Sequence, residues 1–402
     1  MKRTRIIGCR IYQRALATAM HFIAFPEPFV ISEKDSLKKV APYIISKGYR
    51  NPLIVTDSTI LSLGLSSPLE ASLKENGLSY ALYSGVIPNP TFQVVIEAKE
   101  LYLSSNCDCL IALGGGSSMD AAKAAGALIS NRSSSLLSLK GVLKVKKRPP
   151  LLIAIPTTAG TGSEATVAAV VVDERNHNKF SINDPHLIPD CAVLDDSLLK
   201  GLPKKVISTT GVDALTHAVE SYIGHARTRK TKAYALEATS LISKSLFAFY
   251  SDPNNDESRQ NMQKAAYLAG VSFTRSYVGY VHALAHALGG KYNVPHGLAN
   301  AILLPVVLER YGKKCQKRLA ELALAAGLGK DLQDEEKLAK AFISWIKEEN
   351  SKMGIPMNFG GLIKEEDIPA LAKTSDKEAN PLYPVPLELD AEELSKIYME
   401  VK

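Results

Sequence analysis

Residues 107–117 read CDCLIALGGGS, a short apolar run that ends in three glycines and a serine. This pattern predicts a buried strand that stops at a tight turn, and the helical pattern that opens at Asp120 and Ala121 predicts a helix after it. NPLIVTD (51–57) and LLIAIPTT (151–158) predict two further strands, with helical segments such as FQVVIEAKELYLS between them. Alternating strands and helices predict a parallel sheet that is covered by helices.

The glycine turn is also a candidate binding element, because ligands of parallel sheets sit outside the carboxyl ends of the strands. Gly115, Gly116 and Ser117 allow backbone N–H groups to approach a phosphate at the start of the next helix. The sequence lacks the G-x-G-x-x-G dinucleotide pattern. An ordinary strand-to-helix turn is therefore the alternative interpretation.

Two other predicted strands also end in candidate binding residues. TTAGTGSE (157–164) offers hydroxyls and amides to a phosphate or to a nicotinamide carboxamide, and a capped turn is the alternative. Asp57 ends the first strand, where an acid accepts hydrogen bonds from a ribose 2′-hydroxyl and repels a 2′-phosphate. Asp57 is equally suited to cap the next helix. Two such loops in one sheet favour a nucleotide-binding domain.

The character of the chain changes after GLPKK (201–205), where long helical patterns replace the β-branched runs. We predict an N-terminal helical extension (1–26), an α/β dinucleotide-binding domain with a parallel sheet (27–200) and an all-α metal-binding and substrate domain (201–402). A bound molecule is expected in the cleft between the two halves.

Composition narrows the class of protein. The 402 residues are 46% hydrophobic and 22% charged, and no apolar run reaches membrane-spanning length. The net charge of +7 comes with two basic clusters, but no recognisable nucleic-acid module accompanies them. Five scattered cysteines fit reduced thiols better than a disulfide framework. We therefore expect a cytoplasmic protein without nucleic-acid or membrane partners.

The second half contains a cluster of residues that can bind a metal. Asp213 and His217 are four residues apart, as are His282 and His286, so that a helix places each pair on one face. His296 follows after a Gly-Gly break. Spacing alone favours His282 and His286 as a ligand pair. One carboxylate and several imidazoles can hold a divalent cation that keeps an open coordination site.

Together these motifs resemble the iron-containing alcohol dehydrogenase family, in its alcohol dehydrogenase and lactaldehyde reductase branch. The matching segments are VTD (55–57), PNPT (88–91), GGGSSMDAAKAAG (114–126), IPTTAGTGSE (155–164), LPKKVISTTGVDALTHAVESYI (202–223) and GYVHALAHALGGKYNVPHGLANAILLP (279–305). The resemblance implies Fe²⁺, with Zn²⁺ as the alternative, together with NAD(H). It further implies reversible hydride transfer between a short primary alcohol or diol and NAD, and a homodimer.

The resemblance also assigns roles to single residues. Metal binding falls to Asp213, His217, His282 and His296, so His286 becomes a proton relay instead of a ligand. The positions that match dinucleotide-binding residues are Asn89, Gly115, Gly116, Ser117, Asp120, Thr157, Thr158, Thr161, Ser163 and Lys179. Asp57 joins them from its place at the end of the first strand. Phe273 matches a substrate-pocket position.

Some features depart from the family pattern and leave alternatives open. Arg275 and Tyr277 stand where many relatives have small or amide residues, and the segment NPLYPVPLELD (380–390) is atypical. Both features are expected to reshape the substrate pocket. The alternatives are a zinc polyol dehydrogenase of the glycerol type, a dehydroquinate-synthase-like lyase, and a metal- and nucleotide-binding protein without catalysis.

Overall fold

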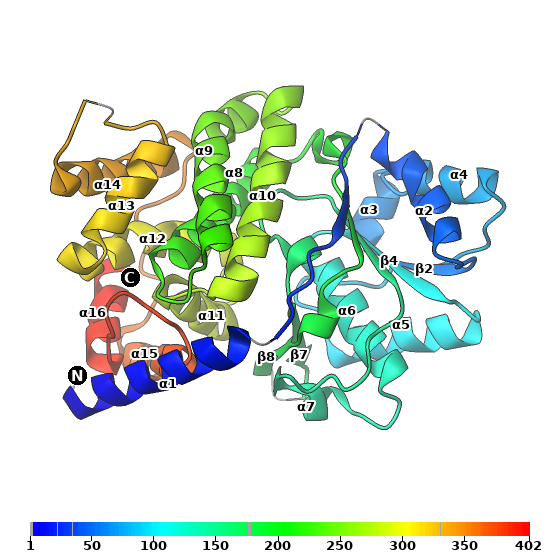
Figure 1. Cartoon of the computed structure of the whole chain (residues 1–402), viewed down its shortest axis with the longest axis horizontal. Helices are drawn as coiled ribbons and strands as arrows, with labels where there is room; N and C mark the ends of the chain where they lie inside the picture. The colour runs from blue at the N-terminus through cyan, green and yellow to red at the C-terminus, as the bar shows by residue number, and fades with distance from the viewer. Residues whose placement is uncertain (1–2, 22, 34, 176–177, 330) are drawn as a thin grey trace. The chain divides into compact units, whose positions relative to one another are not determined.

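The structure is a computed structural model that describes residues 3–21, 23–33, 35–175, 178–329 and 331–402. The chain divides into two compact units, one of Phe25–Lys200 and one of Met1–Ala24 with Gly201–Lys402. The first contains a parallel sheet with helices and the second is helical, which confirms the predicted fold class (Figure 1). The proposed limits of three separate domains remain a prediction.

The first unit is built on a six-stranded parallel sheet in the order β1-β9-β6-β4-β2-β3. Its strands are β1 (Phe29–Ile31), β2 (Pro52–Val55), β3 (Ala81–Tyr83), β4 (Cys109–Gly114), β6 (Leu152–Pro156) and β9 (Cys191–Val193). The three strands expected from the sequence are β2, β4 and β6, and they are neighbours, with Leu110 of β4 in register with Leu53 and Leu152. A smaller sheet has the order β5-β8-β7, from β5 (Gly141–Val142), β7 (Ala168–Asp173) and β8 (Asn178–Asn183).

Both faces of the large sheet are buried. Leu110 packs with Met119 and Ala122 on one face, and Ile111 packs with Val40 and Leu69 on the other. Successive strand residues point to opposite faces. A strand covered by helices on both sides is therefore apolar throughout, as CLIAL is.

Helices α2 (Val40–Ser46), α3 (Ser58–Ser62), α4 (Ser67–Glu75), α5 (Phe92–Ser104), α6 (Gly116–Ser130) and α7 (Leu136–Leu139) complete this unit. Helix α6 begins at Gly116, one turn before the start that the sequence predicted at Asp120. The reason is local: Gly115 takes an extended conformation as the N-cap, so the chain turns into the helix immediately after it.

The second unit contains α1 (Arg3–His21), α8 (Lys204–Ile223), α9 (Arg229–Ser251), α10 (Asp256–Ser276), α11 (Tyr280–Tyr292), α12 (His296–Tyr311), α13 (Gln316–Ala325), α14 (Glu335–Lys352), α15 (Ile368–Ala379) and α16 (Ala391–Val401). No strand occurs among the residues that the structure describes between 201 and 402. Helices α8, α9 and α10 pack against one another (Figure 1).

The N-terminal helix α1 packs on the helical unit. The guanidinium of Arg5 lies 2.6 Å from Asp376, and Gln13 donates a hydrogen bond of 2.8 Å to the carbonyl of Tyr383. Arg10 binds the carbonyl of Val385 at 2.8 Å. In the described part of the chain, no helix is both long enough and apolar enough to cross a bilayer.

Candidate metal and dinucleotide site

Four residues from three helices converge inside the helical unit. Asp213 and His217 lie on α8, His282 lies on α11 and His296 begins α12. One ligand atom from each of the four falls within 4.8 Å of all the others, and Asp213, His217 and His282 are buried. The pairs His282–Asp213 and His296–Asp213 are 3.9 Å and 3.5 Å apart, measured from Nε2 to Oδ1.

His286 lies beside this group but is not one of the four. Its ring centroid is 5.2 Å from that of His296 and 6.0 Å from that of His282. Its Nδ1 atom lies 2.7 Å from Oε1 of Glu378, which also accepts a hydrogen bond of 2.9 Å from the hydroxyl of Tyr383. The structure therefore gathers the set that the family resemblance implies, and not the His282–His286 pair that helical spacing favoured.

Glu220 fixes the orientation of His282 and was missed in the sequence. Its Oε2 atom lies 2.6 Å from Nδ1 of His282 and accepts a hydrogen bond of 2.8 Å from the N–H of Gly279. Its Oε1 atom accepts a bond of 2.8 Å from the N–H of Val281. Glu220 therefore serves as the missing cap of α11, whose N-cap residue Gly279 has no side chain.

The electrostatics of the site suit a cation. Burial, together with His217 and His296, lowers the pKa of His282 well below its ordinary value, so the ring is neutral. With Glu220 holding the Nδ1 proton, Nε2 presents a lone pair towards Asp213. Burial raises the pKa of Glu220 to about 7, against the opposing effect of the backbone N–H groups of α11. A set of three imidazoles and one carboxylate fits a divalent transition metal.

Asn300 is a second residue that the sequence analysis overlooked. It is fully buried, and its Nδ2 atom donates a hydrogen bond of 2.6 Å to Oδ1 of Asp213. The same atom lies 3.1 Å from Nε2 of His296, which is one helical turn earlier on α12. Asn300 could have been found from its spacing of four residues from His296, which places both on one helix face. Glu220 could have been found in the same way, because it follows His217 by three residues.

Phe273, the predicted substrate-pocket residue, lies on α10 against the metal-binding group. Its ring stacks on that of His217, with centroids 4.1 Å apart and planes at 14°. Tyr277 ends the same helix with a φ of 65°, in the left-handed region. These positions leave the substrate role of Phe273 a prediction.

The glycine turn of the first unit is tightly constrained. Gly114 has a φ of 149°, and a Cβ atom there would lie 2.4 Å from Oγ of Ser118. A Cβ atom on Gly116 would lie 3.0 Å from Cγ2 of Thr161, whereas one on Gly115 would be in ordinary contact with Thr158 at 3.7 Å. The two loops predicted to bind a dinucleotide are therefore neighbours.

Other predicted dinucleotide residues surround this turn. Asn89 has a φ of 57°, its N–H donates to Oγ of Ser117 at 3.3 Å, and its Oδ1 accepts a bond of 2.6 Å from Lys179. Asp57 caps α3, with Oδ1 accepting from the N–H groups of Thr59 and Ile60. The N–H of Thr157 donates to the carbonyl of Gly114 at 3.0 Å, and Oγ1 of Thr161 accepts from the N–H of Ser163.

A buried ionisable network supports the second loop and was not foreseen. Lys123 is fully buried, and its Nζ atom donates to Ser163, Thr166 and Ala168, at 2.6 Å for the carbonyl of Ser163. The hydroxyl of Ser163 also donates to Asp120 at 3.2 Å. Burial raises the pKa of Asp120 to about 6 and lowers that of Lys123 to about 8.

Comparison with known proteins identifies the family of the chain. Residues 27–196 match the family model described as iron-containing alcohol dehydrogenase, and residues 207–401 match the model of its C-terminal part. Alcohol dehydrogenase 4 of Saccharomyces cerevisiae is 39% identical over 88% of this chain and 91% of its own length. Lactaldehyde reductase of Escherichia coli is 37% identical over 82% of this chain and 86% of its own length.

A solved structure, that of an alcohol dehydrogenase from Oenococcus oeni, is also similar. It superimposes with a TM-score of 0.90 at 34% identity, covering 94% of this chain and all of the other. Matched in both units, in sequence and in fold, the chain belongs to the iron-containing alcohol dehydrogenase family.

Proposed function

We propose that the protein transfers hydride reversibly between a short primary alcohol or diol and NAD(H). The observation that carries this proposal is the group of Asp213, His217, His282 and His296, of which the first three are buried. These residues would hold Fe²⁺, with Zn²⁺ as the alternative, since imidazole and carboxylate ligands suit both ions. When bound, a divalent cation lowers the pKa of an alcohol and polarises an aldehyde carbonyl.

The proposed dinucleotide site uses the loops of the first unit. Gly115, Gly116 and Ser117 would hold the phosphates at the N-terminus of α6, where backbone N–H groups and the helix dipole favour negative charge. Asp57 would bind the adenosine ribose and so favour NAD(H) over NADP(H). The nicotinamide and the remaining contacts are assigned to Asn89, Asp120, Thr157, Thr158, Thr161, Ser163 and Lys179.

His286 is proposed to move the proton that accompanies hydride transfer. An imidazole ring has two nitrogen atoms and can both accept and donate a proton. The carboxylate of Glu378 lies 2.7 Å from its Nδ1 atom and would keep that nitrogen protonated, so that Nε2 exchanges the proton. Phe273, which stacks on His217, would form an apolar wall of the substrate pocket.

The replacement His282→Ala tests the proposal. We expect loss of bound metal by elemental analysis and loss of alcohol-dependent NADH formation. His186→Ala is the matched control, because this partly exposed histidine lies in the other unit and pairs with Asp184. Full turnover in a metal-free His282→Ala variant contradicts the mechanism.

Two further measurements separate the alternatives. Elemental analysis of anaerobically purified protein distinguishes iron from zinc. Stopped-flow absorbance of bound NADH on addition of short aldehydes distinguishes an enzyme from a binding protein, because only an enzyme consumes the NADH. A panel of alcohols and diols with NAD then identifies the substrate.

We also propose a homodimer in the cytoplasm. The homodimer is expected from the family resemblance, and light scattering of the purified protein tests it. The cytoplasmic location is supported by the five cysteines, which are all free and buried. Cell fractionation tests the location.

A further inference from the structure

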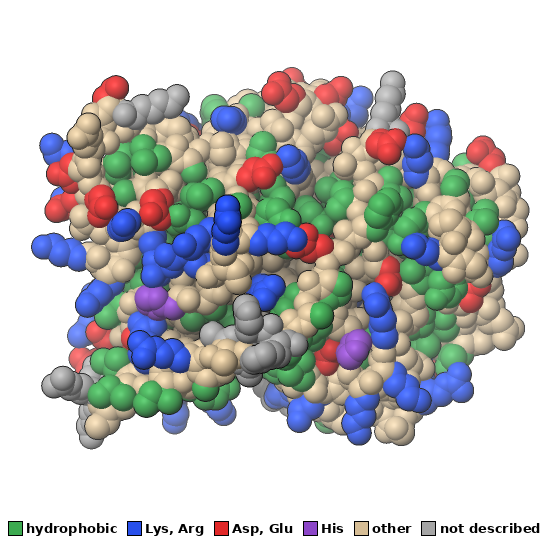
Figure 2. All heavy atoms as spheres, in the orientation of Figure 1, with side chains coloured by type: hydrophobic (Ala, Val, Ile, Leu, Met, Phe, Trp, Pro, Cys, Tyr) green, Lys and Arg blue, Asp and Glu red, His purple; other side chains and the backbone are tan. Residues whose placement is uncertain are grey.

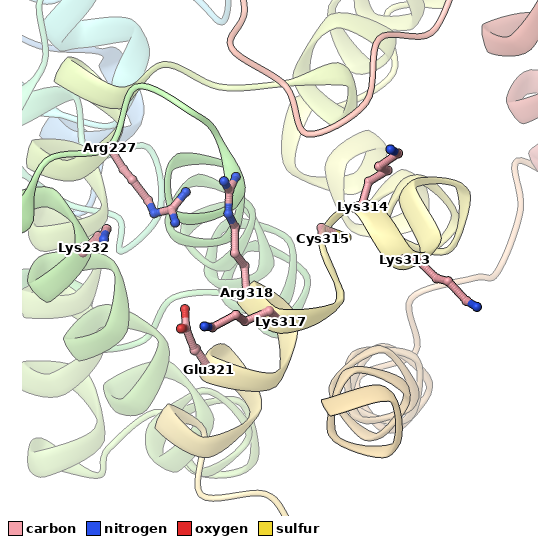
Figure 3. A pocket seen from close by; sticks show the side chains of 8 residues that line it. All are labelled: Arg227, Lys232, Lys313, Lys314, Cys315, Lys317, Arg318 and Glu321. Carbon is pink, nitrogen blue, oxygen red and sulfur yellow. The ribbon is translucent and has the colours of Figure 1, made fainter. Parts of the chain in front are cut away.

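A hollow of about 380 Å³ in the helical unit is lined almost entirely by cations (Figure 3). It lies where α8 ends and α13 begins. The lining residues are Arg227, Lys232, Lys313, Lys314, Cys315, Lys317, Arg318 and Glu321. Figure 2 shows Lys and Arg side chains gathered over the helical unit on the face in view.

The lysines and arginines that line this hollow outnumber its acidic residues. Among the described residues, no carboxylate oxygen lies within 4.0 Å of a charged nitrogen of the six lysines and arginines. Glu321 is the one acidic residue of the lining, and its Oε2 atom accepts a hydrogen bond of 2.6 Å from Tyr222. In Figure 3, Lys313 and Lys314 extend away from Arg227, Arg318 and Lys317, which lie close to one another. Like charges gathered at one hollow repel one another, and a bound anion relieves that repulsion.

Two of the cations are held in place by backbone carbonyls. Arg227 donates to the carbonyl of Gly224 at 2.9 Å, and Arg318 donates to the carbonyls of Ile223 and Gly224, the latter at 3.2 Å. Their guanidinium groups face each other in Figure 3. The Nε atom of Arg227 is buried without a hydrogen-bond partner in the described structure. Both guanidinium groups are therefore held in place before a ligand binds, and that of Arg227 still has one N–H group without an acceptor.

The surroundings add to the positive potential. Helix α13 starts here without a side-chain cap and without an acidic residue in its first turn. Its first turn instead contains Lys317 and Arg318. The positive end of the helix dipole thus adds to the side-chain charges. Burial and the charge of Arg227 lower the pKa of Arg318 to about 10. Burial, Arg318 and Arg10 lower that of His225 to about 4.

We propose that this hollow binds a small phosphate anion that carries two or more negative charges. Arginine forks and lysine ammonium groups are the usual ligands of phosphate oxygens. No aromatic side chain lines the hollow, so a nucleobase would have no stacking partner there. The concave shape favours a compact anion, such as a diphosphate, over an acidic protein surface. This site is separate from the proposed dinucleotide site and does not depend on the proposed reaction.

Isothermal titration calorimetry with inorganic pyrophosphate tests the proposal. The full-length protein is titrated at about 150 mM NaCl with saturating NADH, so that pyrophosphate is kept out of the dinucleotide site. We expect saturable binding of one pyrophosphate per chain, weakened about tenfold or more by Arg227→Gln with Lys317→Gln. If the first variant does not fold, the double variant Lys232→Gln with Lys317→Gln replaces it, because both side chains are exposed, and the same weakening is expected. Glu321→Gln should tighten binding several-fold, since it removes the one negative charge.

The control is Lys146→Gln with Lys147→Gln, which removes two exposed charges from the other unit. Equal weakening by this control shows that only net charge matters and overturns the site. ADP and hexaglutamate are titrated in parallel. ADP bound no more tightly than pyrophosphate supports recognition of the phosphates alone. Tighter binding of hexaglutamate, or no saturation with pyrophosphate, overturns the proposal.

Discussion

The carboxylate of Glu220 lies 2.6 Å from Nδ1 of His282 and links helix α8 to helix α11. The same carboxylate accepts the N–H groups of Gly279 and Val281, so one side chain both caps α11 and orients the imidazole. A Cβ atom on Gly279 would lie 2.6 Å from Oε1 of Glu220, which explains why glycine stands there. Partners of this kind fix the tautomer of a metal ligand and raise its basicity.

The replacement Glu220→Gln is therefore predicted to weaken metal binding about 10- to 100-fold. The amide has one acceptor atom where the carboxylate has two. It therefore cannot accept from His282 and Gly279 at one atom and also from the N–H of Val281 at the other. Competition with a metal-binding chromophore under anaerobic conditions measures the affinity. Glu309→Gln, a part-exposed carboxylate of the same unit that pairs with Lys347, is the control. Unchanged affinity in Glu220→Gln shows that His282 needs no orienting partner.

Asp57 offers a prediction on coenzyme choice. Its Oδ1 atom caps α3, so that Asp57→Gly removes both a cap and a charge. Asp57→Ser keeps a capping oxygen and removes the charge alone. We expect Asp57→Ser to raise kcat/KM with NADPH several-fold while the thermal unfolding midpoint stays within a few degrees. If Asp57 only caps the helix, the ratio of NADPH to NADH efficiency does not move.

The adjacent glycines 114 and 115 allow fold and binding to be separated. Gly114→Ala should destabilise the protein, because φ is 149° and Cβ would collide with Ser118. Gly115→Ala meets only an ordinary contact with Thr158, so its stability should be unchanged. Gly115 is instead proposed to contact the phosphates of the dinucleotide, where a methyl group would interfere. We therefore expect the affinity for NADH, measured by fluorescence titration, to fall about tenfold or more. Normal NADH binding in Gly115→Ala excludes this position from the dinucleotide site.

The buried carboxyl group of Glu164 is expected to make the free energy of unfolding depend on pH. Burial raises its pKa from 4.5 to about 7, although Lys123 opposes the shift. A carboxyl with a raised folded pKa stabilises the fold when neutral, so this contribution is complete below pH 4.5 and is lost as pH rises through 7. Glu164→Gln should lie within about 1 kcal/mol of the wild type at pH 5 and exceed it by about 3 kcal/mol near pH 8.

Urea unfolding at pH 5, 6, 7 and 8 measures this difference. Glu100→Gln, an exposed carboxylate of the same unit, is the control and should follow the wild type at each pH. A constant difference between Glu164→Gln and the wild type across the range means that Glu164 does not titrate there.

Local sequence patterns predict most of the fold. The runs around Ile54, Leu110 and Ile153 identify β2, β4 and β6, because a strand buried on both faces must be apolar throughout. The start of α6 was placed late, since the extended conformation of Gly115 leaves no trace in hydrophobic periodicity. Glu220 and Asn300 were missed because a charged or amide residue on a helix reads as a solvent-facing position until its tertiary neighbours are known.

The sequence by itself determined the two-unit fold, the glycine turn and the composition of the metal-binding group, because strand apolarity, turn residues and motif order are local properties of the chain. The structure gathers His282, and not His286, with Asp213, His217 and His296, as the family resemblance implied and helical spacing did not. Only the tertiary structure revealed the carboxylate of Glu220 beside His282, the buried amine of Lys123 and the cation-lined hollow at Arg227 and Arg318. These features depend on atoms brought together from distant helices, and helical spacing gives no information on which helices meet.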